Sequence, residues 1–275
     1  MKLRLRASYV LCLFVLSFLA SSIHSKETYT FGIVPQQSAS KLVKLWGPIL
    51  QKLSEESGVR IQFATAPDIP TFEQRLKQGM YDFSYMNPYH FTVFNEKPGY
   101  QALAKAKDKR IKGIIVVRKD STISNLKQLE NTDMAFPAPA AFAASILPRA
   151  HLAASGIKIR PQYVSSHDSV YLNVAKGIYS AGGGVMRTFN NMDQSTKDQL
   201  RILWITQGYT PHAIAAHPRV ASETAEKIQK ALLNLGNSAD GEMLLKAIKL
   251  KGFISASNAD WDDVRGLKIN LLNDL

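Results

Sequence analysis

An alternation of strand-like and helix-like segments runs through almost all of the 275 residues and constrains the fold more than any other feature. Apolar residues recur every three or four positions between Ser38 and Gly58, which predicts a helix that buries one face. Short apolar runs at 28–34 and 59–64 predict a strand on either side of it. Such alternation builds sheets with helices on both faces and ligand sites beyond the strand ends. We therefore expect an α/β fold.

The alternation continues to the C-terminus. A helix is expected at 139–155, and two more close the chain. The other predicted strands are YDFSYM, KGIIVVRKD, DMAFP, RPQYV, YSAGGGV and LRILWIT, and the other predicted helices are TFEQRLKQG and SSHDSVYLNVAKG.

The first 25 residues have the layout of a secretory signal peptide, with basic residues, then an apolar run, then small and polar residues. Because the run has only about a dozen apolar residues, it is too short to span a bilayer. Cleavage is expected after Ser22 or Ser25, which predicts a periplasmic protein. The single cysteine, Cys12, lies inside this segment, so the mature chain has no thiol for a disulfide or a redox site.

The net charge of +12, from 34 basic and 22 acidic residues, favours an anionic partner. The basic residues are scattered except in KAKDKRIK at 105–112, which we interpret as a solvated loop. A nucleic-acid site would need a stripe of basic and aromatic residues, and a metal site would need histidines at ligand spacing. The sequence shows neither pattern, so we expect no nucleic-acid partner, no metal and no cofactor.

Six segments of the chain, taken in order, resemble the periplasmic phosphate-, phosphite- and phosphonate-binding proteins, which are solute-binding components of ABC importers. These segments are FGIVP…LWGPILQKLSEESGVRIQFATAPD, LKQGMYDFSYMNP, PGYQALA…GIIVVRKDS, SHDSVYLNVAKG, LRILWIT and GFISASNADWDDVRGL. The resemblance covers nearly all of the mature chain, although no single motif is decisive. It implies a type II periplasmic-binding-protein fold, in which two α/β lobes with mixed sheets close around a ligand and two hinge strands join them.

The resemblance also implies a division of the chain. Lobe one would contain residues 26–114 and 211–275, and lobe two residues 115–210, with crossings near Ile114–Arg118 and Thr206–His212. A monomer of this kind would deliver a small anion to an ABC permease at the inner membrane. The same fold can instead serve as a sensor that docks on a membrane histidine kinase, and the sequence leaves this alternative open.

The ligand site departs from the family pattern. In the phosphonate binders, the helix that matches Ala141–Ile146 opens with a Ser-Thr-Ser-Gly-like run, whose hydroxyls and amides hold the phosphonate oxygens. Here the run is AFAA. One acidic residue that meets the ligand's amino group is replaced by Val185 or a neighbour, and another by His212. Tyr85 and His167 match family contacts. The resemblance therefore implies the family fold without its aminophosphonate specificity.

The start of the helix at 139–155 is the first candidate site. Its unpaired amides and partial positive charge would hold an anion without side-chain help. The small side chains of Ala141 and Ala143 would let a ligand approach, and Phe142 would cover an apolar part of it. The alternative is that this segment only packs against the other lobe or a sheet. An oxyanion or organic acid with an apolar part is the expected ligand.

Further candidates lie in AGGGVMRT and SHD. Gly183 and Gly184 would allow positive φ angles and an anion-binding nest of amides, and Arg187 would pair with an oxyanion. The alternative is a tight contact between lobes with Arg187 solvated. His167 would donate a hydrogen bond to the ligand, and Asp168 is interpreted as a helix cap.

Tyr85 and Asn87 end a predicted strand, where hydrogen bonds into the cleft are favoured, and His212 near the second crossing would face the cleft or bridge the lobes. A hydrolytic Ser-His-Asp arrangement at 166–168 is excluded because adjacent residues cannot form the relay that a triad needs. We therefore expect a binding protein with no catalytic residues.

Overall fold

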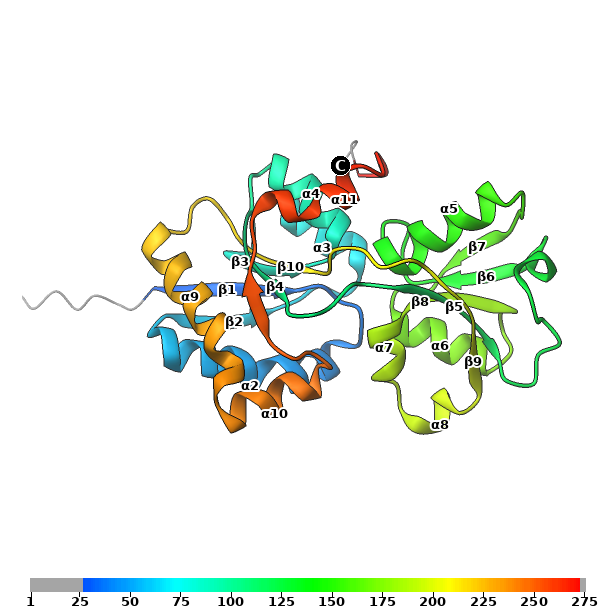
Figure 1. Ribbon diagram of the computed structural model, residues 1–275, viewed down its shortest axis with the longest axis horizontal. Helices are drawn as coiled ribbons and strands as arrows, with labels where there is room; N and C mark the ends of the chain where they lie inside the picture. Colours follow the sequence, from blue (N-terminus) through cyan, green and yellow to red (C-terminus); the bar gives the residue numbers. More distant parts are fainter. Residues whose placement is uncertain (1–26, 273–275) are drawn as a thin grey trace, which may run out of the picture.

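The computed structural model describes residues 27–272, which form two lobes, each built around one sheet. The lobes lie side by side along the long axis of the molecule (Figure 1). The expected signal peptide and its cleavage site fall outside the described residues. None of the helices within residues 27–272 is long and apolar enough to cross a membrane.

The first sheet has the strand order β11-β4-β10-β3-β1-β2. Strand β1 pairs in parallel with β2 and β3, whereas β10 pairs antiparallel with β3 and β4, and β11 antiparallel with β4. The sheet is therefore mixed, as expected. Its strands are β1 (Thr28–Ile33), β2 (Arg60–Ala64), β3 (Phe83–Met86), β4 (Gln101–Ala106), β10 (Ala213–Ala216) and β11 (Phe253–Ser255).

The second sheet has the order β7-β6-β8-β5-β9 and is also mixed. Strand β6 pairs in parallel with β7 and β8, and β5 pairs antiparallel with β8 and β9. Its strands are β5 (Gly113–Arg118), β6 (Asp133–Phe136), β7 (Arg160–Tyr163), β8 (Ala181–Val185) and β9 (Leu200–Ile205).

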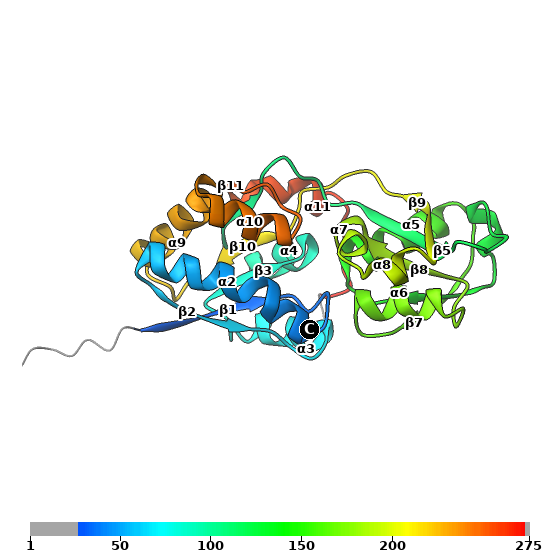
Figure 2. The same ribbon diagram turned by 90° about the horizontal axis from the view of Figure 1, so that it is seen from below.

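Helices cover both faces of each sheet (Figures 1 and 2). On the first sheet, α2, α9 and α10 contact one another on one face, and α3, α4 and α11 lie on the other. On the second, α6, α7 and α8 lie opposite α5 and the segment η2. The bounds are α2 (Ala39–Ser57), α3 (Ile69–Lys77), α4 (Pro88–Glu96), η1 (Leu126–Leu129), η2 (Phe142–Ile146), α5 (Leu147–Ala154), α6 (His167–Ala175), α7 (Met186–Asn190), α8 (Gln194–Lys197), α9 (Ser222–Asn234), η3 (Leu235–Asn237), α10 (Ala239–Ala247), η4 (Asn258–Trp261) and α11 (Asp262–Arg265).

The chain passes between the two sheets at residues 107–112 and 206–212, and a β-bridge between Ile111 and Tyr209 ties the two crossings together. The second crossing lies where the sequence placed it. The first lies a few residues earlier than expected, because all of β5, including Ile114–Arg118, pairs with β8 and β9 of the second sheet.

Local signals at helix ends agree with the sequence. The hydroxyl of Ser38 caps α2 by accepting from the amide of Lys41, and Gly58 ends this helix with a φ of 69°. The segment expected as a helix at 139–155 differs, because it opens with a π-helical turn, η2, before α5 begins. Pro148 has no N–H to donate to the carbonyl four residues earlier, so a regular α-helical ladder cannot run through this position.

The buried core of the first lobe continues into the second. Side chains of residues 138–147, which include η2, and Val185 at the end of β8 belong to the same cluster of buried apolar residues as the first sheet and its helices. Two smaller clusters pack under α6 and under α5 on the faces of the second sheet. The lobes therefore meet through η2 and the end of β8, and this contact forms the walls of the cleft.

Candidate ligand-binding site

A small cavity, which we call the inner cavity, lies between the lobes where η2 meets the first sheet. It offers about 10 Å³ of space to the centre of a water molecule, which is room for about one water. Its walls bring together six of the predicted site residues from both lobes, namely Asn87, Ala141, Phe142, Ala143, His167 and His212.

The first turn of η2 supplies main-chain donors to this cavity. None of the hydrogen bonds formed within residues 27–272 uses the amides of Phe142, Ala143 or Ala144. The side chains here are small except that of Phe142, which is buried and packs edge-on against Tyr209 of the second crossing, with ring centroids 5.5 Å apart. The segment therefore packs against the other lobe, as the alternative interpretation expected, and has three amides without a hydrogen bond beside the inner cavity.

The glycines of β8 have a different role from the predicted one. Gly183 and Gly184 lie in a regular strand, have no positive φ and line neither cavity of the cleft, so the proposed anion nest is wrong. A Cβ atom on Gly183 would collide with the carbonyl oxygen of Ala144 in η2, and one on Gly184 with the hydroxyl of Tyr171. These positions need glycine because η2 and α6 approach the strand closely.

Tyr85 and His212 form a stacked pair at the boundary of the cavity. Their ring centroids lie 4.7 Å apart with an interplanar angle of 13°, and Tyr85 also packs on Trp46 of α2 at 4.6 Å. The Nε2 atom of His212 is buried and has no hydrogen-bond partner within the described residues. Burial, reinforced by the charge of Arg187, holds the pKa of His212 well below its usual value, so the ring is neutral. Burial raises the pKa of Tyr85.

His167 begins α6, where the hydroxyl of Ser166 caps the helix. Its amide donates to the carbonyl of Gln36 across the cleft at 3.0 Å, and its Nδ1 lies 3.1 Å from the hydroxyl of Thr188. Burial, together with the nearby Arg187 charge, lowers the pKa of His167 to about 3. The imidazole is therefore neutral at physiological pH, and it offers a hydrogen bond rather than a charge.

Asn87 is held by protein partners. Its Oδ1 accepts from the amide of His90 at 2.8 Å and so caps α4, while its Nδ2 donates to the carbonyl of Ala140 in the other lobe at 3.4 Å. Asp168 is not a helix cap. It lies 3.6 Å from the ammonium of Lys41 in the first lobe, and burial raises its pKa. The hydroxyl of Ser166 already accepts from the first-turn amide of Ser169, so Asp168 is left to bridge the lobes.

Arg187 on α7 supplies positive charge to the cleft. Its guanidinium donates to the side chain of Gln36 and lies 5.9 Å above the ring of Tyr85. It takes part in none of the ion pairs formed by the described residues. Gln36, which the sequence analysis missed, therefore joins the lobes through both its carbonyl and its side chain.

A larger space, which we call the outer pocket, adjoins the inner cavity beside the crossings and has a volume of about 340 Å³. Ile111, Val185 and His212 line both spaces, and Tyr85 lines the outer pocket. Its rim contains Arg187 and three basic residues of the run interpreted as a solvated loop, Lys109, Arg110 and Lys112. These three side chains are exposed, as predicted, but the run follows the first crossing and so faces the cleft.

No acidic side chain of the described residues lines either space, and residues 27–272 hold no group of three or more potential metal ligands. The donors of the cleft are thus main-chain amides, neutral imidazoles and cations. Such a set complements an anion and offers no carboxylate to an ammonium group.

Comparison with known proteins agrees with this geometry. Residues 31–261 match the sequence model of the family described as "ABC transporter, phosphonate, periplasmic substrate-binding protein". The chain belongs to this family. Its members are periplasmic substrate-binding components of ABC transporters and not enzymes, and no finding favours the sensor-kinase alternative.

Individual relatives are distant in sequence but similar in structure. The phosphate-import protein PhnD of Mycolicibacterium smegmatis is 21% identical over 87% of this chain and 84% of its own length. PhnD1 of Prochlorococcus marinus, solved in complex with methylphosphonate, is 19% identical with a TM-score of 0.81, over 91% of this chain and all of that one. A binding protein of an ABC phosphonate transporter from Pseudomonas aeruginosa is 16% identical with a TM-score of 0.82, over 88% and 86% of the two chains. The two-lobed periplasmic-binding-protein fold expected from the sequence is therefore confirmed.

Proposed function

We propose that this protein captures a small oxyanion of the phosphate, phosphite or phosphonate class, or a related organic anion, in the cleft and delivers it to an ABC permease at the inner membrane. The observation that carries the proposal is Arg187, a cation that lines the cleft beside His212 and Tyr85 without any carboxylate partner in residues 27–272. An anionic ligand is the group that would neutralise it.

The inner cavity has room for about one water, so it would take one oxygen atom of the ligand and supply the remaining contacts. Phe142, Ala143 and Ala144 lie where the family pattern has hydroxyl side chains, and their own side chains are apolar. Their free main-chain amides are therefore the donors to the ligand. Buried donors of this kind strengthen hydrogen bonds to an anion because water is excluded. Since no carboxylate of residues 27–272 lines the cleft, an aminophosphonate would leave its ammonium group unpaired and should bind poorly.

The names of the relatives support the ligand class, since one is a phosphate-import protein and another was solved with methylphosphonate. We further propose that residues 1–25 form a signal peptide cleaved after Ser22 or Ser25, and that the mature protein acts in the periplasm as a monomer. Its lobes would comprise residues 26–112 with 211–275, and residues 113–210, as the two sheets divide the chain.

A binding screen tests the proposal. Thermal unfolding of the mature protein is followed with phosphate, phosphite, methylphosphonate, sulfonates, carboxylates and aminoalkylphosphonates. A true ligand at 100 times its dissociation constant adds about 2.7 kcal/mol of stability. We expect phosphorus oxyanions to stabilise the protein most, and aminoalkylphosphonates to stabilise it least.

The variant Arg187→Met should weaken the binding of the best anion about 10- to 100-fold, the range for a lost hydrogen bond to a charged group. Arg60→Met is the matched control, because Arg60 is exposed at the start of β2. Stabilisation by cationic or neutral compounds only, or unchanged anion affinity in Arg187→Met, would refute the proposal.

A further inference from the structure

We propose that the outer pocket is a second anion subsite, so that the natural ligand is an oxyanion carrying another acidic group on a short apolar linker. The inference rests on the proposed function and specifies its ligand class. It starts from the position of the pocket, which shares the side chains of Ile111, Val185 and His212 with the inner cavity. A ligand that places one oxygen atom in the inner cavity therefore has the rest of its atoms in this space.

The charges of the outer pocket are cationic only. Arg110 is partly neutralised, because its guanidinium lies 2.7 Å from a carboxylate oxygen of Asp263. Lys109, Lys112 and Arg187 form none of the ion pairs found within the described residues. Three cations around one pocket without an acid repel one another, and a second negative charge on the ligand would relieve this repulsion.

The rest of the wall is apolar. Ala106, Met186, Pro211 and Leu250 line the pocket together with the shared residues Ile111 and Val185. An apolar linker of a few carbons would bury against these side chains, while its terminal acidic group would reach the lysines at the rim. The volume of about 340 Å³ is large for a bare phosphate ion and suits such an extended ligand.

His212 gives independent support. Its Nε2 atom is buried without a partner in the described part of the chain, yet the residue lines both spaces. A buried imidazole nitrogen without a partner costs free energy unless a ligand atom meets it. A ligand that passes from one space to the other would come within reach of this atom.

The test compares three phosphonates that share a three-carbon chain and differ in the charge at its end. The probes are 2-carboxyethylphosphonate, which carries the second acid, propylphosphonate, which has a methyl group in its place, and 3-aminopropylphosphonate, which carries a cation. We expect the carboxylated probe to bind about 5- to 20-fold tighter than propylphosphonate at low salt, from weak contributions of several partly exposed charges. This preference should shrink as salt screens the rim.

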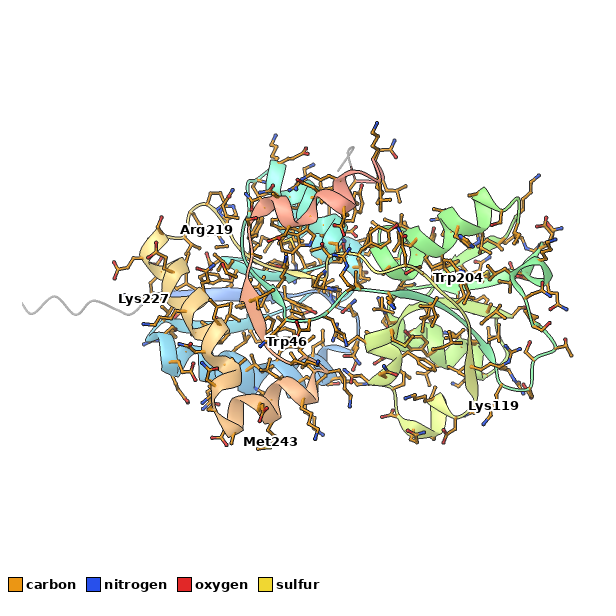
Figure 3. All side chains as sticks on the ribbon, in the orientation of Figure 1. Trp46, Lys119, Trp204, Arg219, Lys227 and Met243 are labelled. Carbon is orange, nitrogen blue, oxygen red and sulfur yellow. The ribbon has the colours of Figure 1, made fainter. Side chains whose placement is uncertain are left out.

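The variant Lys109→Gln/Lys112→Gln should reduce the preference to about threefold or less and leave the affinity for methylphosphonate within about twofold. The control Lys107→Gln/Lys119→Gln removes the same charge from two exposed lysines that do not line the pocket, and Lys119 lies in the second lobe far from the cleft (Figure 3). The control should keep the preference of the unmodified protein.

Each outcome is decisive. Equal binding of the carboxylated and propyl probes, or an unchanged preference in Lys109→Gln/Lys112→Gln, overturns the second subsite while methylphosphonate binding upholds the proposed function. Binding of none of the phosphonates, methylphosphonate included, refutes the proposed function itself. Tightest binding of the aminopropyl probe contradicts both.

Discussion

The inner cavity and the outer pocket adjoin one another but differ in the groups that line them. The inner cavity is closed by buried main-chain and neutral groups, with η2 packed directly on the glycines of β8. The outer pocket is rimmed by exposed cations from the first crossing and from α7. Since buried dipoles act at short range and exposed charges act through water, the inner cavity should select by shape and hydrogen bonding, and the outer pocket by net charge.

Among the glycines of β8 the closest approach is at Gly183, and its replacement should have the largest effect of the changes considered below. In Gly183→Ala the new methyl group would collide with the carbonyl of Ala144 and the ring of Phe136, so η2 or β8 must shift. We expect the free energy of unfolding to fall by about 3 kcal/mol, the upper range for overpacking. Urea unfolding of the ligand-free protein measures this loss.

Gly47→Ala is the matched control, because a Cβ at Gly47 of α2 meets nothing within 4 Å. It should leave the free energy of unfolding within about 0.5 kcal/mol, because the helical preference of alanine over glycine is offset by the strain of a Cβ on the residue before Pro48. If Gly183→Ala kept full stability and lost only anion affinity, the glycine run would be a ligand-binding nest after all, and the inner cavity would not depend on close packing.

The uncharged character of the inner cavity predicts a pH effect of intermediate size. Burial lowers the pKa of His167 from the ordinary 6.5 to about 3 in the folded protein. The unfolded chain therefore takes up a proton below pH 6.5 while the folded chain does not. Stability from this residue is complete above pH 6.5 and falls as the pH drops toward 3, by about 2 kcal/mol at pH 5.

Unfolding of His167→Gln at pH 7.5 and pH 5 tests this sign. The loss of stability between the two values should be about 2 kcal/mol smaller in the variant than in the unmodified protein. His151→Gln, at an exposed histidine of α5, is the control for removing a histidine. A larger loss in His167→Gln would mean that the inner cavity holds a charged imidazole, and the contrast between the two spaces would disappear.

The sequence predicted the strands that carry β-branched and aromatic residues, such as β1, β5 and β9, and missed three strands of the first sheet. The missed strands are β4, β10 and β11, with the sequences QALAKA, AIAA and FIS. Alanine-rich and very short segments have little strand propensity of their own, so their conformation is set by pairing with neighbours. Helix α4 was also missed, since six of its nine residues are buried and give no amphipathic period.

The residues that line the cleft were predictable where a strand ends or a helix begins, as for Tyr85, His167 and Ala141–Ala143. The glycine run was misread because glycine permits both a positive φ and close packing, and only the neighbouring elements decide between them. The rim lysines were read as solvated, which is true of their exposure. Their orientation toward the cleft depends on the path of the first crossing, which local sequence does not specify.

The smallest predicted effect concerns His212, the residue that both spaces share. His212→Phe keeps an aromatic ring for stacking on Tyr85 and removes the buried, unpartnered Nε2. Because that nitrogen has no partner in the described residues, its loss should leave the ligand-free protein as stable or about 1 kcal/mol more stable. Affinity for the anion should fall about 5- to 10-fold, the effect of one neutral hydrogen bond.

His212→Leu removes the ring as well, so the difference between the two variants isolates the stacking. Calorimetric titration beside urea unfolding separates binding from stability. Unchanged affinity in His212→Phe would mean that the ligand does not pass this side chain, and the two spaces would then act independently.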